Sequence, residues 1–287
     1  MPLLSITRES VSLVLMKPWV SVVIPTFNDK HYICQAIDSV LAQTYKNIEI
    51  FVIDDGSSDG TEDMLKKYKN KIKYIYQENK GLSGARNAGL KMAQGKYISL
   101  LDADDIYHKE RIKNQIKFLE NDHDYALSYS DVRHFRDGEN KLMRLKYQYY
   151  SGNIFEKLLK KNFIAPSSVL FKKEMINKIG YFDEDLKKSE DWDYWLRMAN
   201  AGYKFKYLSE ALTYIRIRQS GNLGSRAFKL QHKIDLIRSL SKFSDTEKYI
   251  FYQAIGLIFA IGYPKSIKWL VNKYLFLKDK WRYQSQK

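Results

Sequence analysis

The sequence predicts an α/β fold in which helices flank a mostly parallel central sheet. From Trp19 to Tyr129, short β-branched runs alternate with amphipathic segments of about ten residues, which is typical of consecutive βαβ units. Two acidic clusters, Asp54–Asp55 and Asp102–Asp105, directly follow predicted strands. Ligands of parallel sheets bind at the carboxyl ends of strands, so these clusters indicate a binding site as well as a fold.

The alternation defines five strands and four helices in this stretch. The first strand, Val20–Ile24, is apolar and ends at Pro25. The helix after it carries apolar residues at i, i+3, i+4, i+7 and i+8 from Ile33 to Leu41, the period of an amphipathic helix. The other predicted strands are Ile48–Ile53, Ile72–Tyr76, Tyr97–Leu101 and Tyr125–Tyr129, and the other helices are Thr61–Tyr68, Ser83–Ala93 and Lys109–Glu120.

The pattern is less regular after Ser130. A helix near Ile154–Leu159, a short strand near Ser168–Phe171 and the acidic, aromatic segment Ser189–Ala201 are the clearest features there. The last part of the chain again predicts helices, at Phe228–Leu240, Glu247–Ile261 and Lys265–Phe276. We therefore expect an N-terminal extension (1–18), one main domain (19–226) and a C-terminal helical region (227–287).

The 48 Lys and Arg residues exceed the 33 Asp and Glu residues, which gives a formal net charge of +15. A surface of this charge attracts nucleic acid, phosphate-rich substrates or an anionic membrane, although an ordinary solvated basic surface explains it equally well. The sequence has no zinc-ligand spacing and no recognisable nucleic-acid motif, so nucleic acid is not an expected partner.

Cysteine usage and hydropathy bear on the cellular compartment. The single cysteine, Cys34, excludes an intrachain disulfide and indicates a reducing environment such as the cytoplasm. The first 18 residues lack the basic start and long apolar core of a signal peptide. No segment reaches the ~18 apolar residues of a membrane span, and Tyr249–Tyr263 comes nearest.

Asp102 and Asp104 form an Asp-x-Asp triplet at the end of an apolar strand. Carboxylates at i and i+2 of a tight turn can converge on one hard cation, and Mg²⁺ or Mn²⁺ fills its remaining positions with water and phosphate oxygens. Such a metal acts as a Lewis acid on a diphosphate leaving group. Capping of the following helix is the alternative role for these acids.

Asp54 and Asp55 stand in a polar, glycine-bearing turn. A carboxylate at a strand end can accept a hydrogen bond from a pyrimidine N–H or a ribose hydroxyl, or it can satisfy backbone N–H groups of the turn. We expect base recognition for one of the two and a turn role for the other. The Gly81–Gly89 segment lacks the spacing of a dinucleotide site, and its Arg86 can pair with phosphate or remain a solvated side chain.

Glu190 and Asp191 lie in Ser189–Leu196, among aromatic residues. A carboxylate next to another carboxylate in apolar surroundings has a raised pKa, which suits a general base near neutral pH. A helix N-terminus, where the helix dipole favours acids, explains the pair equally well.

Five ordered motifs make the stretch from Val20 to Arg218 resemble family 2 glycosyltransferases. They are Val23–Asn28, Val52–Thr61, Gly81–Asn87, Leu100–Asp105 and Ser189–Asp191. Each motif is weak alone, whereas the full set in this order is specific. The resemblance implies the GT-A fold, with a nucleotide-binding half (19–129) joined to an acceptor-binding half (130–226). It also implies a single displacement that inverts the anomeric configuration.

The resemblance further implies roles for individual residues. Pro25, Thr26 and Asp54 line the nucleotide base, Arg86 lies near the diphosphate, Asp102 bonds the ribose, Asp104 coordinates Mn²⁺ or Mg²⁺, and Asp191 is the catalytic base. Asn28, Asp55 and Glu190 complete the expected nucleotide-sugar site. Relatives often carry Arg-x-His where this chain has Arg216-Ile217-Arg218, so Arg218 is expected to neutralise phosphate charge in place of a second metal ligand.

A UDP-sugar is the expected donor because it is the commonest in the family, with GDP- and dTDP-sugars as alternatives. The expected acceptor is a glycan or lipid-linked oligosaccharide of a bacterial surface. Processive members carry Gln-x-x-Arg-Trp and membrane spans, and this sequence has neither, so one sugar per encounter is expected. The basic, aromatic C-terminal region fits a peripheral position on the inner face of the cytoplasmic membrane. It equally fits packing on the main domain or on the second subunit of a homodimer.

Two other functions are alternatives to a glycosyltransferase. A GT-A fold that binds nucleotide or glycan without turnover needs the same cavity but no base. A glycoside hydrolase with paired carboxylates has no need for the Asp-x-Asp triplet or for Arg86.

Overall fold

The structure, a computed structural model of the chain, describes residues 19–254, except 140, 146–147, 219–225, 248 and 251–252. Its strands are β1 (Val20–Thr26), β2 (Ile48–Asp54), β3 (Lys73–Tyr76), β4 (Tyr97–Leu100), β5 (Ile106–Tyr107), β6 (Tyr125–Phe135), β7 (Val169–Lys172) and β8 (Lys204–Arg216). Its α-helices are α2 (Ile33–Leu41), α3 (Thr61–Leu65), α4 (Gly81–Met92), α5 (Arg111–Asn121), α6 (Phe155–Leu158), α7 (Glu174–Ile179), α8 (Glu190–Asn200) and α9 (Arg226–Leu240). Short 3-10 helices span Lys66–Tyr68 and Pro166–Ser168.

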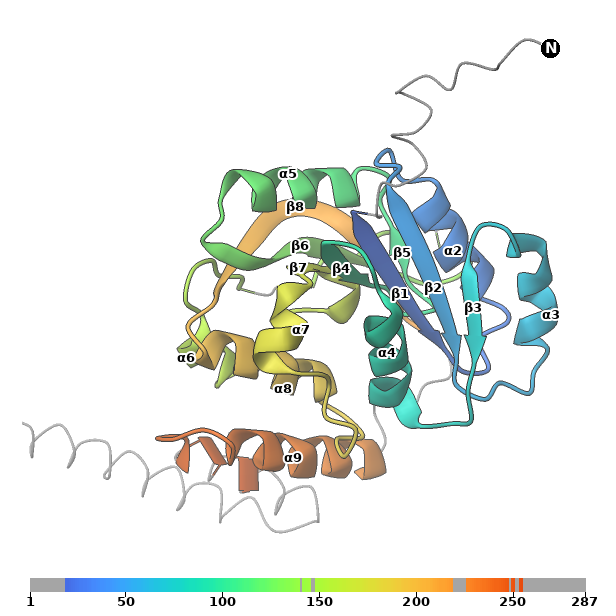
Figure 1. Cartoon of the computed structure of the whole chain (residues 1–287). Coiled ribbons are helices and arrows are strands. Elements are labelled where there is room, and N and C mark those ends of the chain that lie inside the picture. Colours follow the sequence, from blue (N-terminus) through green and yellow to red (C-terminus); the bar gives the residue numbers. More distant parts are fainter. Residues whose placement is uncertain are drawn as a thin grey trace, which may run out of the picture.

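The described strands form one sheet with the order β3-β2-β1-β4-β7-β6-β8-β5, and helices cover both of its faces (Figure 1). This confirms the predicted α/β class. The strands β3, β2, β1 and β4 pair in parallel. The in-register pairs Thr26–Asp54 and Asp54–Tyr76 bring the carboxyl ends of three strands to one edge, where the first acidic cluster lies.

Two hydrophobic cores form on the two faces of the sheet because successive side chains of a strand point in opposite directions. Val23 of β1 joins the core that contains residues of α4 and α8. Val22 and Ile24 join the core that contains residues of α2 and α5. Helix α4 approaches β1 closely at Gly89, where an added Cβ would lie 2.4 Å from a methyl carbon of Val23.

The other half of the sheet mixes strand directions. β7 lies between β4 and β6 and is antiparallel to both, β8 is parallel to β6, and β5 is antiparallel to β8. A parallel connection needs a crossover of a dozen or more residues, usually a helix, but the segment between β6 and β7 contains only the four-residue α6 and the 3-10 helix among its described residues. The parallel pairing expected from the sequence is therefore complete only in the first half.

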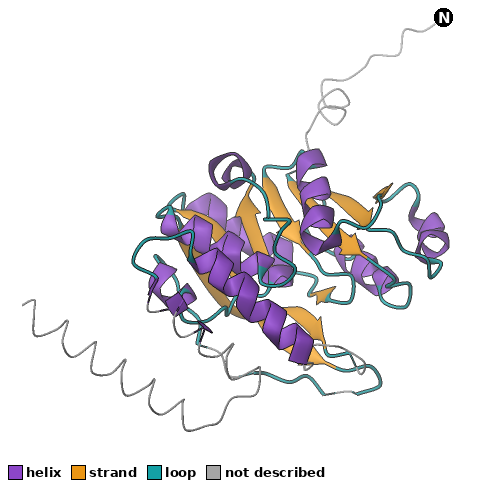
Figure 2. Ribbon diagram, turned by 90° about the horizontal axis from the view of Figure 1, so that it is seen from below, coloured by secondary structure: helices purple, strands orange, loops and turns teal. Residues whose placement is uncertain are grey.

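The first helix of the C-terminal region packs on the main domain. Leu236 and Leu240 of α9 are buried in the same core as Trp192 and Trp195 of α8, and Figure 2 shows α9 running across the side of the molecule that faces the viewer. No helix within the described residues is both long and apolar enough to cross a membrane. The expected extension 1–18 and the expected helices Glu247–Ile261 and Lys265–Phe276 lie wholly or largely outside the described residues.

Candidate active site

A cavity of about 830 Å³ opens where β1, β2 and β4 end. Residues expected at the site line it as a group: Pro25, Thr26, Asp55, Arg86, Asp102, Asp104, Glu190, Asp191 and Arg218. They come from motifs spread over almost two hundred positions of the chain, and the parallel strand ends together with the start of α8 bring them to one place. Asn28 and Asp54 are not among the lining residues.

Asn28 and Asp54 build the turns beside the cavity. The backbone of Asn28 is left-handed, with φ of 55°, and its Oδ1 accepts a hydrogen bond from the N–H of Ser58 at 2.9 Å. Asp54 is buried, and its carboxylate accepts hydrogen bonds from the Ser57 N–H and the Tyr74 hydroxyl, both at 2.8 Å. Of the two adjacent acids, Asp54 therefore has the turn contacts, and Asp55 is the one that reaches the cavity.

Asp55 and Thr26 form the wall near the end of β1. The Asp55 carboxylate accepts hydrogen bonds from the backbone N–H groups of Lys80 and Gly81, at 2.9 and 2.8 Å, and so fixes the start of α4. The hydroxyl of Thr26 is buried and has no hydrogen-bond partner among the described residues. A polar atom of this kind costs free energy unless a ligand or water satisfies it.

The Asp-x-Asp triplet and the adjacent Asp105 are held by the 3-10 helix before β7 and by the end of β8. The backbone N–H of Asp102 donates to Ser167 Oγ at 3.0 Å. The adjacent Asp105 is buried, accepts from Ser167 Oγ at 2.6 Å and from the Arg216 N–H at 3.1 Å, and has a pKa that burial and its acidic neighbours raise. Helix α5 begins only at Arg111, after Glu110, so the triplet does not cap it.

Asp104 has the chemistry for a hard divalent cation. Its Oδ2 accepts from Arg218 Nε at 2.6 Å, and Arg218 Nη2 reaches Asp29 Oδ1 at 2.6 Å, so positive charge already occupies this position. The described residues contain no group of three His, Cys, Asp or Glu side chains able to hold a metal by themselves. The residues therefore fit a cation that takes its other ligands from water and a bound diphosphate, as Mg²⁺ commonly does.

Arg86 links the two halves of the site. Its side chain is only 1% exposed, and its terminal nitrogens lie 2.8 Å from Asp102 Oδ1 and 2.6 Å from Glu190 Oε1. Burial alone would lower the pKa of Arg86, but the two carboxylates raise it, so the guanidinium stays charged. Both terminal nitrogens are engaged by carboxylates, an arrangement that positions Asp102 against Glu190.

Asp191 stands in the first turn of α8, where the helix-start interpretation places it, and it also lines the cavity. Burial, and then the charge of Glu190, raise the pKa of Asp191 to about 7. Asn162 opposes this rise, because its Nδ2 donates to Asp191 Oδ2 at 2.9 Å. The N–H of Ile164 donates to Asn162 Oδ1 at 3.1 Å and thereby fixes which end of the amide faces the acid.

Helix α9 supports the loop that precedes Asp191. The backbone N–H groups of Lys187 and Lys188 donate to Asp235 Oδ2, at 2.9 and 2.7 Å. Ser189, which has a φ of 64°, has its Oγ 2.6 Å from His232 Nδ1. A non-glycine residue with positive φ is strained, and these contacts from α9 hold it in place.

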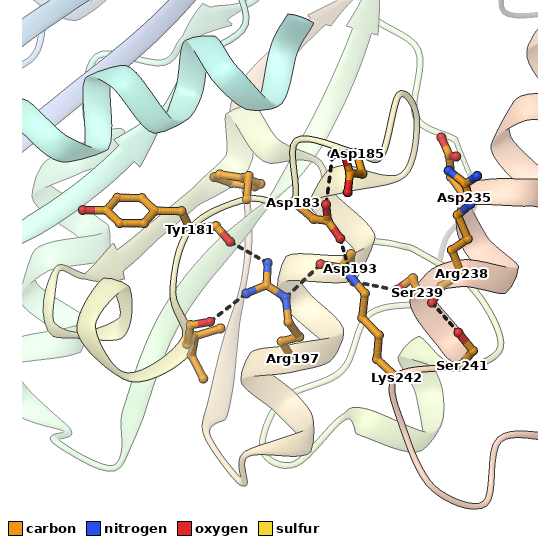
Figure 3. A network of polar contacts seen from close by, with 12 residues as sticks. Tyr181, Asp183, Asp185, Asp193, Arg197, Asp235, Arg238, Ser239, Ser241 and Lys242 are labelled. Atoms are coloured by element: carbon orange, nitrogen blue, oxygen red, sulfur yellow. Dashed lines mark hydrogen bonds and ion pairs between the residues drawn. The ribbon is translucent and has the colours of Figure 1, made fainter. Parts of the chain in front are cut away.

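A buried charge network joins α8 to α9 (Figure 3). Asp193 is fully buried, and its carboxylate accepts hydrogen bonds from Arg197 Nε at 2.8 Å, Lys242 Nζ at 2.7 Å and Ser239 Oγ at 2.9 Å. Lys242 also reaches Asp183 at 2.7 Å. The helix that carries Asp191 is thus fixed by side chains that lie 46 and 49 positions after Asp193, beyond β8.

The cavity also contains residues that the sequence did not single out. Asn162, Lys187, Lys188 and His232 line it. The two lysines directly precede the Ser-Glu-Asp motif, so their place in the chain was a usable signal. Asn162 and His232 lie in segments without a recognisable motif, and only the packing of α9 and of the loop before β7 brings them to the site.

Comparison with known proteins identifies the family. The model for "Glycosyl transferase family 2" matches residues 21–180. A UDP-Glc:alpha-D-GlcNAc-diphosphoundecaprenol beta-1,3-glucosyltransferase of Escherichia coli is 33% identical over 246 residues, which cover 83% of this chain and 94% of that protein. An uncharacterized glycosyltransferase of Rickettsia prowazekii is 40% identical over 191 residues, which cover 64% of this chain and 59% of that protein.

Solved structures agree on the fold. The structure of S. aureus TarS in complex with UDP-GlcNAc has a TM-score of 0.63 at 22% identity, covering 88% of this chain and 74% of that one. A mannosyltransferase from Pyrobaculum calidifontis, in complex with GDP-Man and Mn²⁺, has a TM-score of 0.64 at 18% identity, covering 91% and 81%. The chain has the GT-A fold and belongs to glycosyltransferase family 2.

Proposed function

We propose that this chain is an inverting, metal-assisted glycosyltransferase that moves one sugar from a nucleotide-diphosphate sugar to an acceptor hydroxyl. The observation that carries the proposal is that one cavity is lined by Thr26 and Asp102 at parallel strand ends, Asp191 at the start of α8 and Arg218 after β8. A site for a nucleotide sugar must contact the base, the ribose, the diphosphate and the reacting carbon of one ligand. Catalysis also requires that these contacts hold the ligand in one geometry.

The donor nucleotide takes the part of the cavity near β1 and β4. Thr26 offers its unpartnered buried hydroxyl to the base, beside Pro25 and Asp55. Asp102 accepts from the ribose, and Arg86 holds Asp102 in position from behind. Lys187, Lys188 and Arg218 bring positive charge to the diphosphate. A UDP-sugar is favoured because the E. coli relative is named for UDP-Glc and the TarS complex contains UDP-GlcNAc.

Asp104 would hold Mn²⁺ or Mg²⁺. When bound, such an ion neutralises charge that grows on the departing diphosphate. The Mn²⁺ complex of the Pyrobaculum mannosyltransferase supports this choice of ion.

Asp191 acts as the base. With a pKa raised to about 7, it removes the acceptor hydroxyl proton as the oxygen bonds to the anomeric carbon and the bond from that carbon to the diphosphate oxygen breaks. One displacement with one base inverts the configuration. The neighbouring Glu190 is paired with Arg86, so it supports the site and leaves the proton transfer to Asp191.

The biological setting follows the E. coli relative, whose name specifies an undecaprenol-diphosphate acceptor. We assign the chain to bacterial surface-polysaccharide synthesis, with residues 19–129 as the donor half and 130–226 as the acceptor half. A peripheral position on the inner membrane face brings it to a lipid-linked acceptor.

Calorimetry with UDP, GDP and dTDP, each with and without Mn²⁺, tests this function on the unmodified chain and on Asp104→Asn. We expect one nucleotide to bind with Mn²⁺ and to lose at least tenfold in affinity in Asp104→Asn. Asp191→Asn is the matched control, because it changes a lining acid away from the diphosphate and should leave nucleotide affinity within about twofold. If no nucleotide binds under any condition, the proposal is wrong; if nucleotide binds but no sugar is ever released, the chain is a binding module.

A further inference from the structure

A second cavity, of about 190 Å³, lies beside the first. Its lining residues are Ser130, Val132, His134, Tyr149, Asn162, Phe163, Ile164, Ala165, Asp191 and Ile215. Asn162 and Asp191 are the two described residues that line both cavities. The proposed base therefore stands at the junction of the two spaces.

We infer that the second cavity is the acceptor subsite and that it takes one neutral sugar ring, whose hydroxyl reaches Asp191 from the side away from the nucleotide. The inference rests on the proposed function. It adds to that function where the acceptor enters, how many sugar rings the site holds and which chemical class the acceptor group belongs to.

The floor of this cavity is built by two paired strands. Ser130, Val132 and His134 alternate along β6, and His134 pairs in register with Ile215 of β8. The loop that precedes β7 supplies the opposite wall, from Asn162 to Ala165. Phe163 in that wall packs against Tyr129 and Tyr150, with ring centroids 6.2 and 5.3 Å apart. Paired strands and packed aromatic rings hold the lining of this cavity in one shape, as a ligand-binding site requires.

The charge of the lining excludes a phosphate group. Among the described lining residues there is no Lys or Arg, and Asp191 is the only acid. Arg133 and Arg144 pair instead with the buried Asp131, at 2.7 and 3.0 Å. The first cavity, in contrast, is lined by Arg86, Lys187, Lys188 and Arg218. An anionic group is attracted to the first cavity and has no cation to pair with in the second.

The polar atoms in the second cavity suit hydroxyl groups. His134 Nδ1 is buried without a hydrogen-bond partner among the described residues, and burial lowers the pKa of His134, which favours the neutral ring. Ser130 and Asn162 add further polar atoms, while Val132, Phe163 and Ile215 are apolar. This mixture matches a pyranose, which has hydroxyls at its edge and C–H groups on its faces.

The volume of the second cavity limits how much of the acceptor can enter it. The volume lies below the ~300–1,000 Å³ of sites for drug-sized ligands and corresponds to about six water molecules at ~30 Å³ each. One ring fits, whereas a second sugar or a lipid diphosphate stays outside.

The test fills the second cavity and measures the two ligands separately by NMR saturation transfer and calorimetry. The variants are Ile215→Trp from the floor and Ala165→Leu from the wall, and Met92→Trp, an exposed position on α4, is the control for an added Trp. The probes are UDP with Mn²⁺ and a panel of methyl glycosides of the common hexoses and N-acetylhexosamines. We expect at least one glycoside to bind the UDP-loaded chain, and to lose at least tenfold in affinity in both filled variants but not in Met92→Trp. UDP affinity should stay within about twofold throughout.

Three results would overturn the inference. One is glycoside binding that both filled variants retain, which would place the ring elsewhere. Another is normal UDP binding with no glycoside bound at all. The third is competition of glycerol phosphate with the bound glycoside, which would show that the cavity accepts a phosphate. Absence of UDP binding to the unmodified chain is a different outcome, because it overturns the proposed function itself.

Discussion

Opposing interactions act on the pKa of Asp191. Burial and Glu190 raise its pKa, while Arg86 and the hydrogen bond from Asn162 lower it. The resulting value of about 7 places the acid where its charge changes across the physiological pH range. Both its reactivity and its effect on stability therefore depend on pH.

Replacing Asp191 by Asn should abolish transfer and stabilise the fold at high pH. The pKa of this acid is about 7 in the folded chain and 3.8 in its ordinary state, so the folded chain holds a proton that the unfolded chain has lost between those values. Stability therefore falls as pH rises from about 4 to 7. We expect Asp191→Asn to melt at least ~2 °C above the unmodified chain at pH 8, which corresponds to about 1 kcal/mol for a domain of this size. The difference should vanish at pH 4. Equal melting differences at both pH values, measured by scanning calorimetry, would show that folding does not raise the pKa of Asp191.

Asn162 is predicted to set the pH profile of the reaction. Its amide nitrogen donates to Asp191 and so favours the charged carboxylate. Asn162→Ala should raise the pKa of Asp191 and move the acid limb of kcat/KM for sugar release to higher pH by roughly half to one unit, since a hydrogen bond to a charged group contributes ~1.5 kcal/mol and one unit is 1.36 kcal/mol. Asn153→Ala is the matched control, because Asn153 Oδ1 accepts from the N–H two residues later in the same way but no contact joins it to Asp191. If Asn162→Ala lowers kcat/KM at every pH without shifting the acid limb, Asn162 has only a structural role.

At the scale of elements, the close contact between α4 and β1 gives a sharp test of packing. Gly to Ala in a helix normally stabilises by ~1 kcal/mol. At Gly89 the new Cβ would lie 2.4 Å from a carbon of Val23, so Gly89→Ala should instead destabilise, by about 1–3 kcal/mol as for overpacked cores. Denaturant unfolding measures the change. In a chain that already carries Val23→Ala, Gly89→Ala should destabilise less than it does in the unmodified chain, because the clashing methyl carbons are gone. If the two losses of stability simply add, the contact with Val23 is not the cause.

The network around Asp193 should couple the docking of α9 to activity. Asp193→Asn removes a buried charge, leaves Arg197 without its carboxylate partner and leaves Lys242 with Asp183 as its remaining carboxylate partner. Breaking a buried pair costs ~3–5 kcal/mol, and because the Lys242 side chain is 34% exposed we expect about 2–3 kcal/mol. The rate of sugar release should also fall, because α8 carries the base. Asp185→Asn, an exposed acid of the same loop region, should change neither the melting temperature nor the rate.

At the scale of the whole molecule, charge is the dominant feature. A net charge of +15 predicts binding to anionic vesicles that weakens steeply as salt rises. Co-sedimentation of the full chain with phosphatidylglycerol vesicles at 50 and 300 mM salt should show binding only at the lower value, with neutral phosphatidylcholine vesicles as the control. A chain that stays in the supernatant with both lipids would contradict the peripheral membrane position.

The first half of the fold was readable because most of its parallel strands are apolar and its helices are amphipathic. The second half was readable only in part: the expected helix near Ile154–Leu159 and the expected strand near Ser168–Phe171 correspond to α6 and β7. Strand β8 was missed, since Ser209 and Glu210 are exposed within it and its register with β6 shifts at Ser130 and Asp131. Those irregularities break the two-residue period on which recognition of a strand depends.

The sequence by itself determined the α/β class, the family and the chemistry available at the strand ends, because these depend on local pattern and on motifs in a fixed order. Only the tertiary structure decided that Asp55 rather than Asp54 reaches the cavity, that Arg86 is paired with two carboxylates, and that a second cavity meets the first at Asp191. Each of these results depends on which residues far apart in the chain are brought into contact. Packing decides that, and no local pattern encodes it.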